Sequence, residues 1–170
     1  MRYKARLVIK GYEQQAAIDY YKEELYTPVA KFVSIRALFA IATVLDWEIL
    51  QLDVKTVFLY PEIEEEIYME LLEGYNDGSS SFDKVCRLKR SMYGLKQALK
   101  VWYAAIDEYL HECGFVQSIA ESNLYILSSS SLFLIHYIDD ILIFSQSKGK
   151  ALEIRDQLYL KYKMTDLAPV

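Results

Sequence analysis

Two adjacent aspartates are the residues best suited to chemistry in this 170-residue sequence. Asp139 and Asp140 lie in "HYIDDILIF", between the apolar runs "LFLIHYI" and "ILIF". Two carboxylates ~4 Å apart repel by about 1 kcal/mol in water and about 4 kcal/mol at a semi-buried site. An Asp-Asp pair is also a poor hairpin turn, because such turns favour Asn-Gly, Asp-Gly or Gly-Gly. Three arrangements are open: one carboxyl is protonated, both reach water, or a cation neutralises them.

A third carboxylate favours the cation. Asp53 follows the apolar segment "WEILQL" and would meet the pair at one rim if the two strands were neighbours. Clustered carboxylates with open positions suit Mg²⁺, with Mn²⁺ as the alternative ion. Two such ions about 4 Å apart serve in-line displacement at phosphorus. The residues alone thus predict metal-dependent phosphoryl or nucleotidyl transfer, with a nuclease, a phosphotransferase and a merely solvated turn as alternatives.

The elements that position these residues are read from apolar periodicity. We expect an α+β domain, with an antiparallel sheet and helices packed on one side of it. Ser34 is the expected N-cap of the first helix, and Gly114 the expected end of the second. Strands are expected at 4–9, 47–54, 84–89, 132–138 and 141–144, and helices at 34–46, 95–113 and 150–163.

Composition narrows the function classes. No apolar run approaches the ~18 residues of a membrane span, so no membrane partner is expected. Cys86 and Cys113 lie far apart and are expected to be free thiols. The net charge is −5, yet residues 46–77 carry ten acids and residues 84–100 carry six bases and no acid. A phosphate-bearing partner could contact the basic segment, or the charges could simply keep the domain soluble.

Eight sequence blocks, taken in order, carry a resemblance to a known family. The chain resembles the reverse transcriptase domain of Copia-like long-terminal-repeat retrotransposons over nearly its whole length. The blocks are "YKARLVIKGYEQ", "YTPVAK", "LQLDVKTVFLY", "EEEIYME", "VCRLKRSMYGLKQA", "GFVQS", "HYIDDILIF" and "YKMTDL".

The resemblance implies a right-hand polymerase fold. Residues 1–170 would form a single reverse transcriptase fragment, with 1–36 and roughly 60–92 belonging to the fingers, the remainder to the palm, and the thumb absent. The implied activity is RNA-directed DNA polymerase, extending a primer on an RNA or DNA template from deoxynucleoside triphosphates with two Mg²⁺. In the family, integrase and RNase H domains belong to the same polyprotein. Family members act in cytoplasmic virus-like particles, and their DNA enters the nucleus.

The resemblance also assigns site residues. Asp53, Asp139 and Asp140 match the metal-binding catalytic acids, and the carbonyl of Val54 would complete one coordination shell. Phe58 matches the aromatic position that leaves no room for a 2′-hydroxyl.

Further positions match the nucleotide and primer contacts. Lys4 and Arg6 would meet the triphosphate, and a guanidinium suits that role. The remaining matches are Tyr93, Gly94 and Gln97, which would line the nucleotide and template pocket, and Tyr137 and Ile138, which would lie near the primer end. Each has a plainer alternative: a core aromatic, a surface ion pair, a turn or an exposed helix position.

Several residues depart from the family pattern. Leu99 replaces a proline, Leu71 and Leu72 stand near another expected proline, and Val57 adds methyl groups beside the expected sugar pocket. Overpacking of that kind costs about 1–3 kcal/mol. His136 interrupts a normally apolar strand. The alternative function is therefore a non-catalytic, truncated or degenerate retrotransposon remnant that binds nucleic acid weakly at most.

Overall fold

The computed structural model describes residues 3, 5–21, 25–72, 74–75 and 84–167. The chain divides into two compact units. The first unit is Met1–Tyr26 with Phe58–Trp102, and the second is Thr27–Val57 with Tyr103–Val170. Within the described ranges, no helix is both long and apolar enough to cross a membrane.

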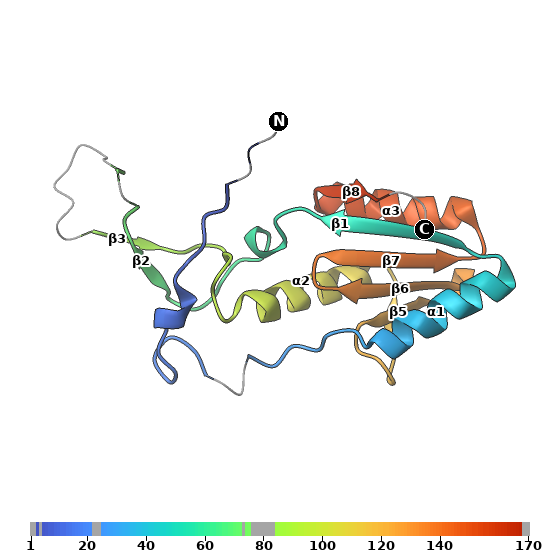
Figure 1. The fold of residues 1–170 in the computed structure, drawn as a ribbon, viewed down its shortest axis with the longest axis horizontal. Helices are drawn as coiled ribbons and strands as arrows, with labels where there is room; N and C mark the ends of the chain where they lie inside the picture. The colour runs from blue at the N-terminus through green and yellow to red at the C-terminus, as the bar shows by residue number, and fades with distance from the viewer. Residues whose placement is uncertain (1–2, 4, 22–24, 73, 76–83, 168–170) are drawn as a thin grey trace. The chain divides into compact units, whose positions relative to one another are not determined.

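A six-stranded sheet forms the centre of the second unit, in the order β4-β5-β6-β7-β1-β8 (Figure 1). Every neighbouring pair in it is antiparallel, as expected. The strands are β1 (Glu48–Val54), β4 (Val116–Gln117), β5 (Leu124–Leu127), β6 (Leu132–Tyr137), β7 (Asp140–Ser145) and β8 (Met164–Asp166).

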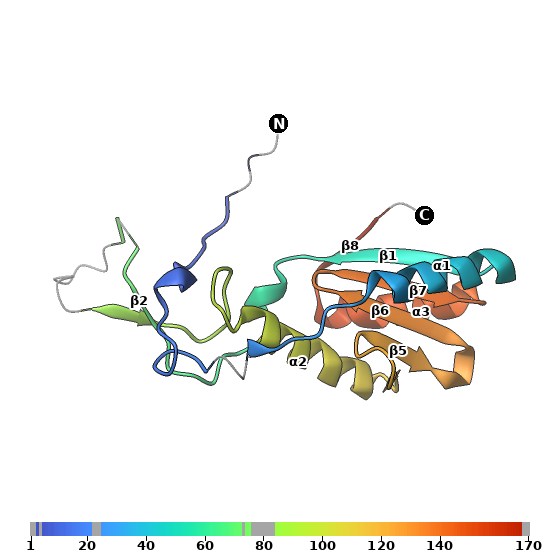
Figure 2. The same ribbon diagram turned by 60° about the horizontal axis from the view of Figure 1, so that its bottom comes forward.

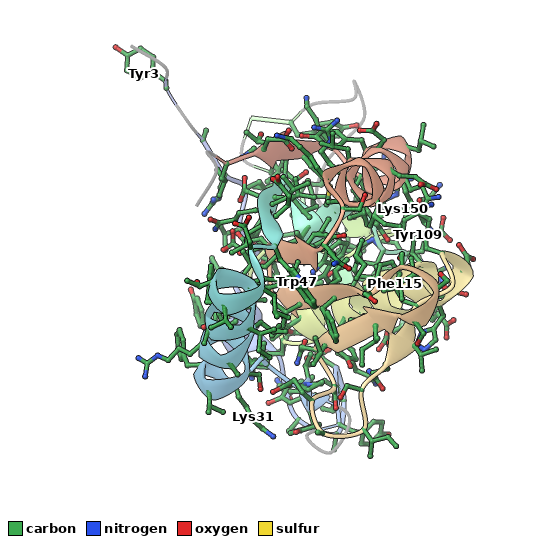
Figure 3. All side chains as sticks on the ribbon, turned by 90° about the vertical axis from the view of Figure 1, so that its right-hand side faces the viewer. Tyr3, Lys31, Trp47, Tyr109, Phe115 and Lys150 are labelled. Atoms are coloured by element: carbon green, nitrogen blue, oxygen red, sulfur yellow. The ribbon has the colours of Figure 1, made fainter. Side chains whose placement is uncertain are left out.

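Helices cover both faces of this sheet, so the prediction of helices on one side is wrong. Helix α1 (Phe32–Leu45) packs through Leu38 and Ala42 on Leu142 and Phe144. The alternate residues of β7 face the other way, toward α3 (Lys148–Lys161). Figure 3 views the sheet from its end and shows α1 on one side and α3 on the other. The reason is the sequence of β7 itself, because "ILIF" is apolar at successive positions and both faces need cover.

The C-terminal part of α2 (Ala98–Glu112) joins α3 on that second face. The hydroxyl of Tyr125, from β5, donates to Asp107 of α2 at 2.7 Å. Tyr109 of α2 donates to the carbonyl of Gln157 in α3, also at 2.7 Å. Figure 2 shows α1 and α2 running along the sheet. The central strands are consequently sealed, and Ile141 and Ile143 have no exposed surface.

The start of α1 differs from the expectation, since Ser34 is not its N-cap. The helix begins at Phe32, and Lys31 occupies the cap position without a side-chain cap. The buried carboxylate of Glu121, which precedes β5, accepts from the Lys31 N–H at 3.2 Å and from the Ser34 hydroxyl at 2.9 Å. A carboxylate supplied from 90 residues away therefore satisfies this helix terminus, which the local sequence does not show.

The first unit contains a two-stranded antiparallel hairpin, β2 (Tyr68–Glu70) and β3 (Val85–Arg87), over a small core that includes Ile63, Ile67 and Leu88. The acidic and basic segments of the sequence face each other here. Arg87 pairs with Glu66 at 3.3 Å, and Arg90 lies opposite Glu62 in an isolated bridge. Part of the charge asymmetry is thus neutralised within the chain.

The N-terminal strand expected at 4–9 is wrong for its described part, residues 5–9, which form no strand. Ile9 makes one backbone hydrogen bond, to the carbonyl of Tyr93 at 2.8 Å, and Leu7 and Val8 are exposed. The other expected elements are confirmed with shifted ends. Gly114 follows α2 with φ +87°, and Leu99 lies in the first turn of α2, where leucine is a good helix former.

Candidate active site

The predicted catalytic aspartates are brought together in the second unit by backbone pairing. In the register of β1 with β7, Asp53 lies opposite Asp140. The N–H of Val54 donates to the carbonyl of Asp139 at 2.8 Å. Two chain segments almost 90 residues apart in sequence thus place the three aspartates and the predicted Val54 ligand at one end of two adjacent strands.

The turn that carries Asp139 is not the Asp-Asp turn that the sequence suggested. Tyr137 pairs with Asp140, so the two central residues are Ile138 and Asp139. Ile138 has φ +59°, and Asp139 is not among the residues with positive φ. A positive φ at the first central residue alone is the pattern of a type II′ turn, which normally has glycine there. A β-branched residue at positive φ is strained, and such strain clusters at functional sites.

The electrostatics of the three aspartates are uneven. The Lys55 ammonium forms an ion pair with Asp53. Asp140 accepts from the Gln51 amide at 3.3 Å. Burial raises the pKa of Asp140, and the nearby charges of Asp139 and Asp53 raise it further, against the opposing effects of Gln51 and Lys55. Repulsion among the carboxylates is therefore present and only partly relieved by the protein's own cation.

The donor set suits a hard divalent cation. Carboxylate oxygens and a backbone carbonyl are the ligands that Mg²⁺ prefers, and the Lys55 ammonium already places a cation against Asp53. Within the described ranges, no three carboxylate, thiol or imidazole groups converge closely enough to form a ready-made metal site. The aspartates are thus neighbours through the backbone, and their side chains would have to turn inward around an ion.

His136 contributes to this region, although the sequence marked it only as an interruption of an apolar strand. It is buried at 2% exposure, and its Nε2 lies 2.7 Å from the carbonyl of Ile138, to which it donates as the N–H tautomer. Burial lowers the pKa of His136 to about 4, against the raising effect of that carbonyl and of Asp107. The imidazole is consequently neutral and supports the strained residue that precedes Asp139. A polar residue in an otherwise apolar strand was the available signal.

Four of the residues predicted to contact the nucleotide lie in the first unit. The Arg6 guanidinium lies 5.2 Å from the centre of the Tyr93 ring, and Phe58 meets that ring edge to face at 4.9 Å. Gly94 follows with φ +98°, and a Cβ there would lie 2.0 Å from the carbonyl oxygen of Ile9. Arg6, Tyr93 and Phe58 thus form a stack, which we call the Tyr93 stack. Lys4, the other predicted triphosphate contact, lies outside the described residues.

Gln97, also predicted to line the nucleotide pocket, is buried at 3% exposure. Its amide donates to the carbonyl of Asp19 at 2.7 Å and accepts from the amide of Gln14 at 3.0 Å. Tyr137, in the second unit, is half-buried and packs 5.9 Å from Phe32 of α1, measured between ring centres. Val57 is buried at 1% exposure.

Comparisons with known proteins identify the family. The whole chain, residues 1–170, matches the family described as reverse transcriptase (RNA-dependent DNA polymerase). It is 40% identical over 172 aligned positions to the retrovirus-related Pol polyprotein from transposon TNT 1-94 of Nicotiana tabacum. This alignment covers 99% of the chain and 13% of that protein.

Two further relatives agree. The chain is 44% identical over 84% of its length to the Pol polyprotein from transposon RE2 of Arabidopsis thaliana, of which it spans 10%. It is 30% identical over 94% of its length to the Ty1-BL Gag-Pol polyprotein of Saccharomyces cerevisiae, of which it spans 9%. No solved structure matches it. The resemblance found in the sequence blocks is thereby confirmed, and the chain belongs to the reverse transcriptase family and is similar to part of the Pol polyproteins of Copia-like transposons.

Proposed function

We propose that this chain carries the nucleotidyl-transfer site of an RNA-directed DNA polymerase, which adds deoxynucleotides to a primer paired with an RNA or DNA template. The observation that carries the proposal is the β1–β7 register, which sets Asp53 opposite Asp140 beside the turn that holds Asp139. In this proposal the second unit corresponds to the palm and the first to the fingers. The chain would work as part of a longer Pol polyprotein, as its relatives' names suggest.

The aspartates would hold two Mg²⁺, with Val54 contributing its backbone carbonyl. When bound, such ions lower the pKa of the attacking hydroxyl and stabilise the leaving oxygen. The chain's own residues supply the arrangement. The strand ladder fixes the spacing of Asp53 and Asp140, and His136 supports the turn that presents Asp139. Lys55 would have to leave Asp53 as a metal ion enters, since both compete for the same carboxylate.

The Tyr93 stack would serve the nucleotide. Arg6 is exposed and bears a delocalised charge that pairs well with phosphate oxygens. Phe58, whose ring is held by Tyr93, is the proposed barrier to a 2′-hydroxyl. The buried position of Gln97 favours a supporting role for it over a direct contact with nucleotide.

Primer extension tests this function. Purified chain is given oligo-dT on poly-A, dTTP and Mg²⁺, and incorporation is compared with that of Asp139→Asn and Asp53→Asn. Loss of a group that stabilises developing charge should lower the rate by at least about a hundredfold. Asp46→Asn is the matched control, because Asp46 is exposed, precedes the opposite end of β1 and has a left-handed backbone that asparagine tolerates.

The result has clear alternatives. Extension that survives in Asp139→Asn would contradict the assignment. Template degradation without extension would favour a nuclease that uses the same acids. A folded chain whose melting temperature does not respond to Mg²⁺ or Mn²⁺, and which extends nothing, would favour a non-catalytic remnant.

A further inference from the structure

A chain of hydrogen bonds runs through the side chains of two glutamines in the first unit. The backbone N–H of Lys96 donates to Oε1 of Gln14 at 2.9 Å. Nε2 of Gln14 donates to Oε1 of Gln97 at 3.0 Å. Nε2 of Gln97 donates to the carbonyl of Asp19 at 2.7 Å. We call this series the glutamine relay, and it links the start of α2 to two points of the N-terminal segment.

The direction of the glutamine relay is fixed by its ends. A backbone N–H can only donate and a backbone carbonyl can only accept. Each glutamine must therefore accept on the Lys96 side and donate on the Asp19 side, so neither amide can be reversed without breaking a bond. An ionised glutamate at position 97 would fail, because it cannot donate to the Asp19 carbonyl.

Further contacts hold the same segments together. The Lys96 ammonium donates to the carbonyl of Gln14 at 3.3 Å and to the hydroxyl of Tyr20 at 2.8 Å. Gly11 lies flat on Gly94, since a Cβ on Gly11 would stand 1.8 Å from the Gly94 carbonyl oxygen. The N-terminal segment therefore crosses the turn before α2 at backbone contact distance.

The relay lies next to the Tyr93 stack. Arg6 has no strand to hold it, and three residues after it the N–H of Ile9 bonds to the carbonyl of Tyr93 at 2.8 Å. The cation–π contact between Arg6 and Tyr93 by itself is a weak restraint at an exposed site. What keeps Arg6 near Tyr93 is thus the docking of residues 9–14, in which the relay ends on Gln97, a side chain buried at 3% exposure.

We propose that Gln14 and Gln97 are positioning residues: their relay fastens the N-terminal segment to the start of α2 and so holds Arg6 over Tyr93. The consequence for nucleotide binding rests on the proposed function, in which Arg6 contacts the triphosphate. The fastening itself does not depend on that function and can be measured without it.

Hydrogen exchange in two variants tests the proposal. Gln97→Glu keeps the shape of the side chain but removes the N–H that donates to the Asp19 carbonyl. Gln14→Met removes both hydrogen bonds that the Gln14 side-chain amide makes. Gln15→Met is the control, because Gln15 is the exposed neighbouring glutamine. We expect the amides of Lys96 and Ile9 to exchange at least roughly tenfold faster than in the unmodified chain at about pH 7 in both variants, with no change in the control.

A change of pH separates a broken relay from general damage. A protonated carboxyl has one donor and one acceptor, so Gln97→Glu should regain protection below about pH 5, whereas Gln14→Met should not. Asp19, Glu65, Glu66 and Lys100 line a cavity of about 270 Å³ together with Gln97, and Lys96 lies over Tyr20. These groups are the same in the variant and in the unmodified chain. The exchange rate of each variant is therefore divided by that of the unmodified chain at the same pH, which cancels the effect of their titration.

The outcomes decide each part. Unchanged exchange at Lys96 and Ile9 in both variants would overturn the relay, as would protection in Gln97→Glu that does not return at low pH. If the unmodified chain extends primers, both variants should raise the KM for deoxynucleotide severalfold with a smaller change in kcat. An unchanged KM despite lost protection would overturn the positioning of Arg6, and a chain that extends nothing would count against the proposed function only.

Discussion

The two groups of candidate residues are held by different means. In the second unit, Asp53 and Asp140 form the last pair of a strand ladder, and the pair next to them is the fully buried Leu52 and Ile141. In the first unit, Arg6 and Tyr93 belong to segments joined by one described backbone bond between Ile9 and Tyr93 and by side-chain amides.

This difference predicts different stabilities. Residues in a buried ladder open only with the surrounding structure, whereas segments joined by a few partly exposed bonds open locally at lower cost. The aspartates should therefore keep their spacing under conditions that already release Arg6.

The largest expected effect is at His136, a buried polar residue of β6, the strand on the other side of β7 from β1. Its pKa of about 4 lies below the usual 6.5 because burial disfavours the charged form. The unfolded chain therefore binds a proton more readily, so the stability that neutral His136 confers is present above about pH 6.5 and is lost as pH falls toward 4. The loss amounts to about 3 kcal/mol by pH 4.

Urea unfolding at several pH values checks this prediction. His136→Phe should have a smaller fall in unfolding free energy between about pH 7 and pH 4 than the unmodified chain. It should also be less stable near pH 7, because the Ile138 carbonyl loses its donor. His111→Phe is the control, since His111 is the other histidine of the chain and is exposed. If the unfolding free energy of His136→Phe fell as steeply with acid as that of the unmodified chain, neutral His136 would not be the source of this pH dependence.

The next effect is at Gly94, where the two segments of the first unit cross. Alanine there would need φ +98° and would place Cβ 2.0 Å from the Ile9 carbonyl oxygen. We expect a local destabilisation of about 2 kcal/mol or more, measured as faster exchange of the Ile9 amide.

Gly74→Ala separates the two causes. Gly74 also has positive φ, +81°, but among the described residues, its chain neighbours aside, no atom lies within 4 Å of the position that its Cβ would take. Gly74→Ala should therefore carry the cost of a positive φ in alanine, without the steric clash that Cβ makes in Gly94→Ala. Equal effects of the two substitutions would mean that backbone contact between residues 9 and 94 does not hold the segment.

The contrast also explains how much the sequence could predict. The strands of the ladder were accessible, because apolar strands follow from local periodicity. Their order in the sheet was not, so the meeting of Asp53 with Asp139 and Asp140 was predicted only on the condition that the two strands are neighbours. Helices on both faces could have been inferred from "ILIF", whose successive apolar residues need cover on two sides.

The first unit was less accessible. No periodicity marks residues 5–15, and their docking depends on long-range partners such as Tyr93 and Gln97. The prediction of a strand there was wrong because Leu7 and Val8 are apolar residues of the kind found in strands, yet in the described structure they are exposed and pair with no other strand. The role of the Glu121 carboxylate at the start of α1 could not be predicted for the same reason, since the Lys31 N–H that it accepts from lies 90 residues away in the sequence.

A smaller effect is expected at Ile138, where the ladder ends in a strained turn. Glycine at this position should relieve a positive φ of +59° and raise the unfolding free energy by about 0.5–1 kcal/mol, after the entropy cost of glycine in the unfolded chain. Ser131→Gly, at φ +49° in the turn between β5 and β6, is the comparison, because serine is not β-branched. Chemical denaturation measures both. A loss of stability in Ile138→Gly would show that the side chain contributes more than the strain costs.

The smallest effect is expected at Asp140, and it measures the repulsion among the aspartates. Burial and the neighbouring carboxylates raise the pKa of Asp140, so the folded chain retains this proton to a higher pH than the unfolded chain does. The stability associated with the bound proton is lost as pH rises through the raised pKa. Asp140→Asn should therefore melt about 1–3 °C higher than the unmodified chain near pH 7, a modest gain because solvent screens the site.

Two dependences distinguish this gain from a general effect of asparagine. It should shrink as the pH falls below the ordinary pKa of aspartate, about 3.9, because Asp140 is then neutral in both the folded and the unfolded state. It should also shrink when Mg²⁺ is added, because a cation among the carboxylates stabilises the unmodified chain more than the variant. Asp46→Asn, in which the aspartate lies beyond the other end of β1, should show neither dependence. A gain in Asp140→Asn that persists at low pH and in Mg²⁺ would mean that the three aspartates do not share one electrostatic environment, and the metal site would lose its main physical support.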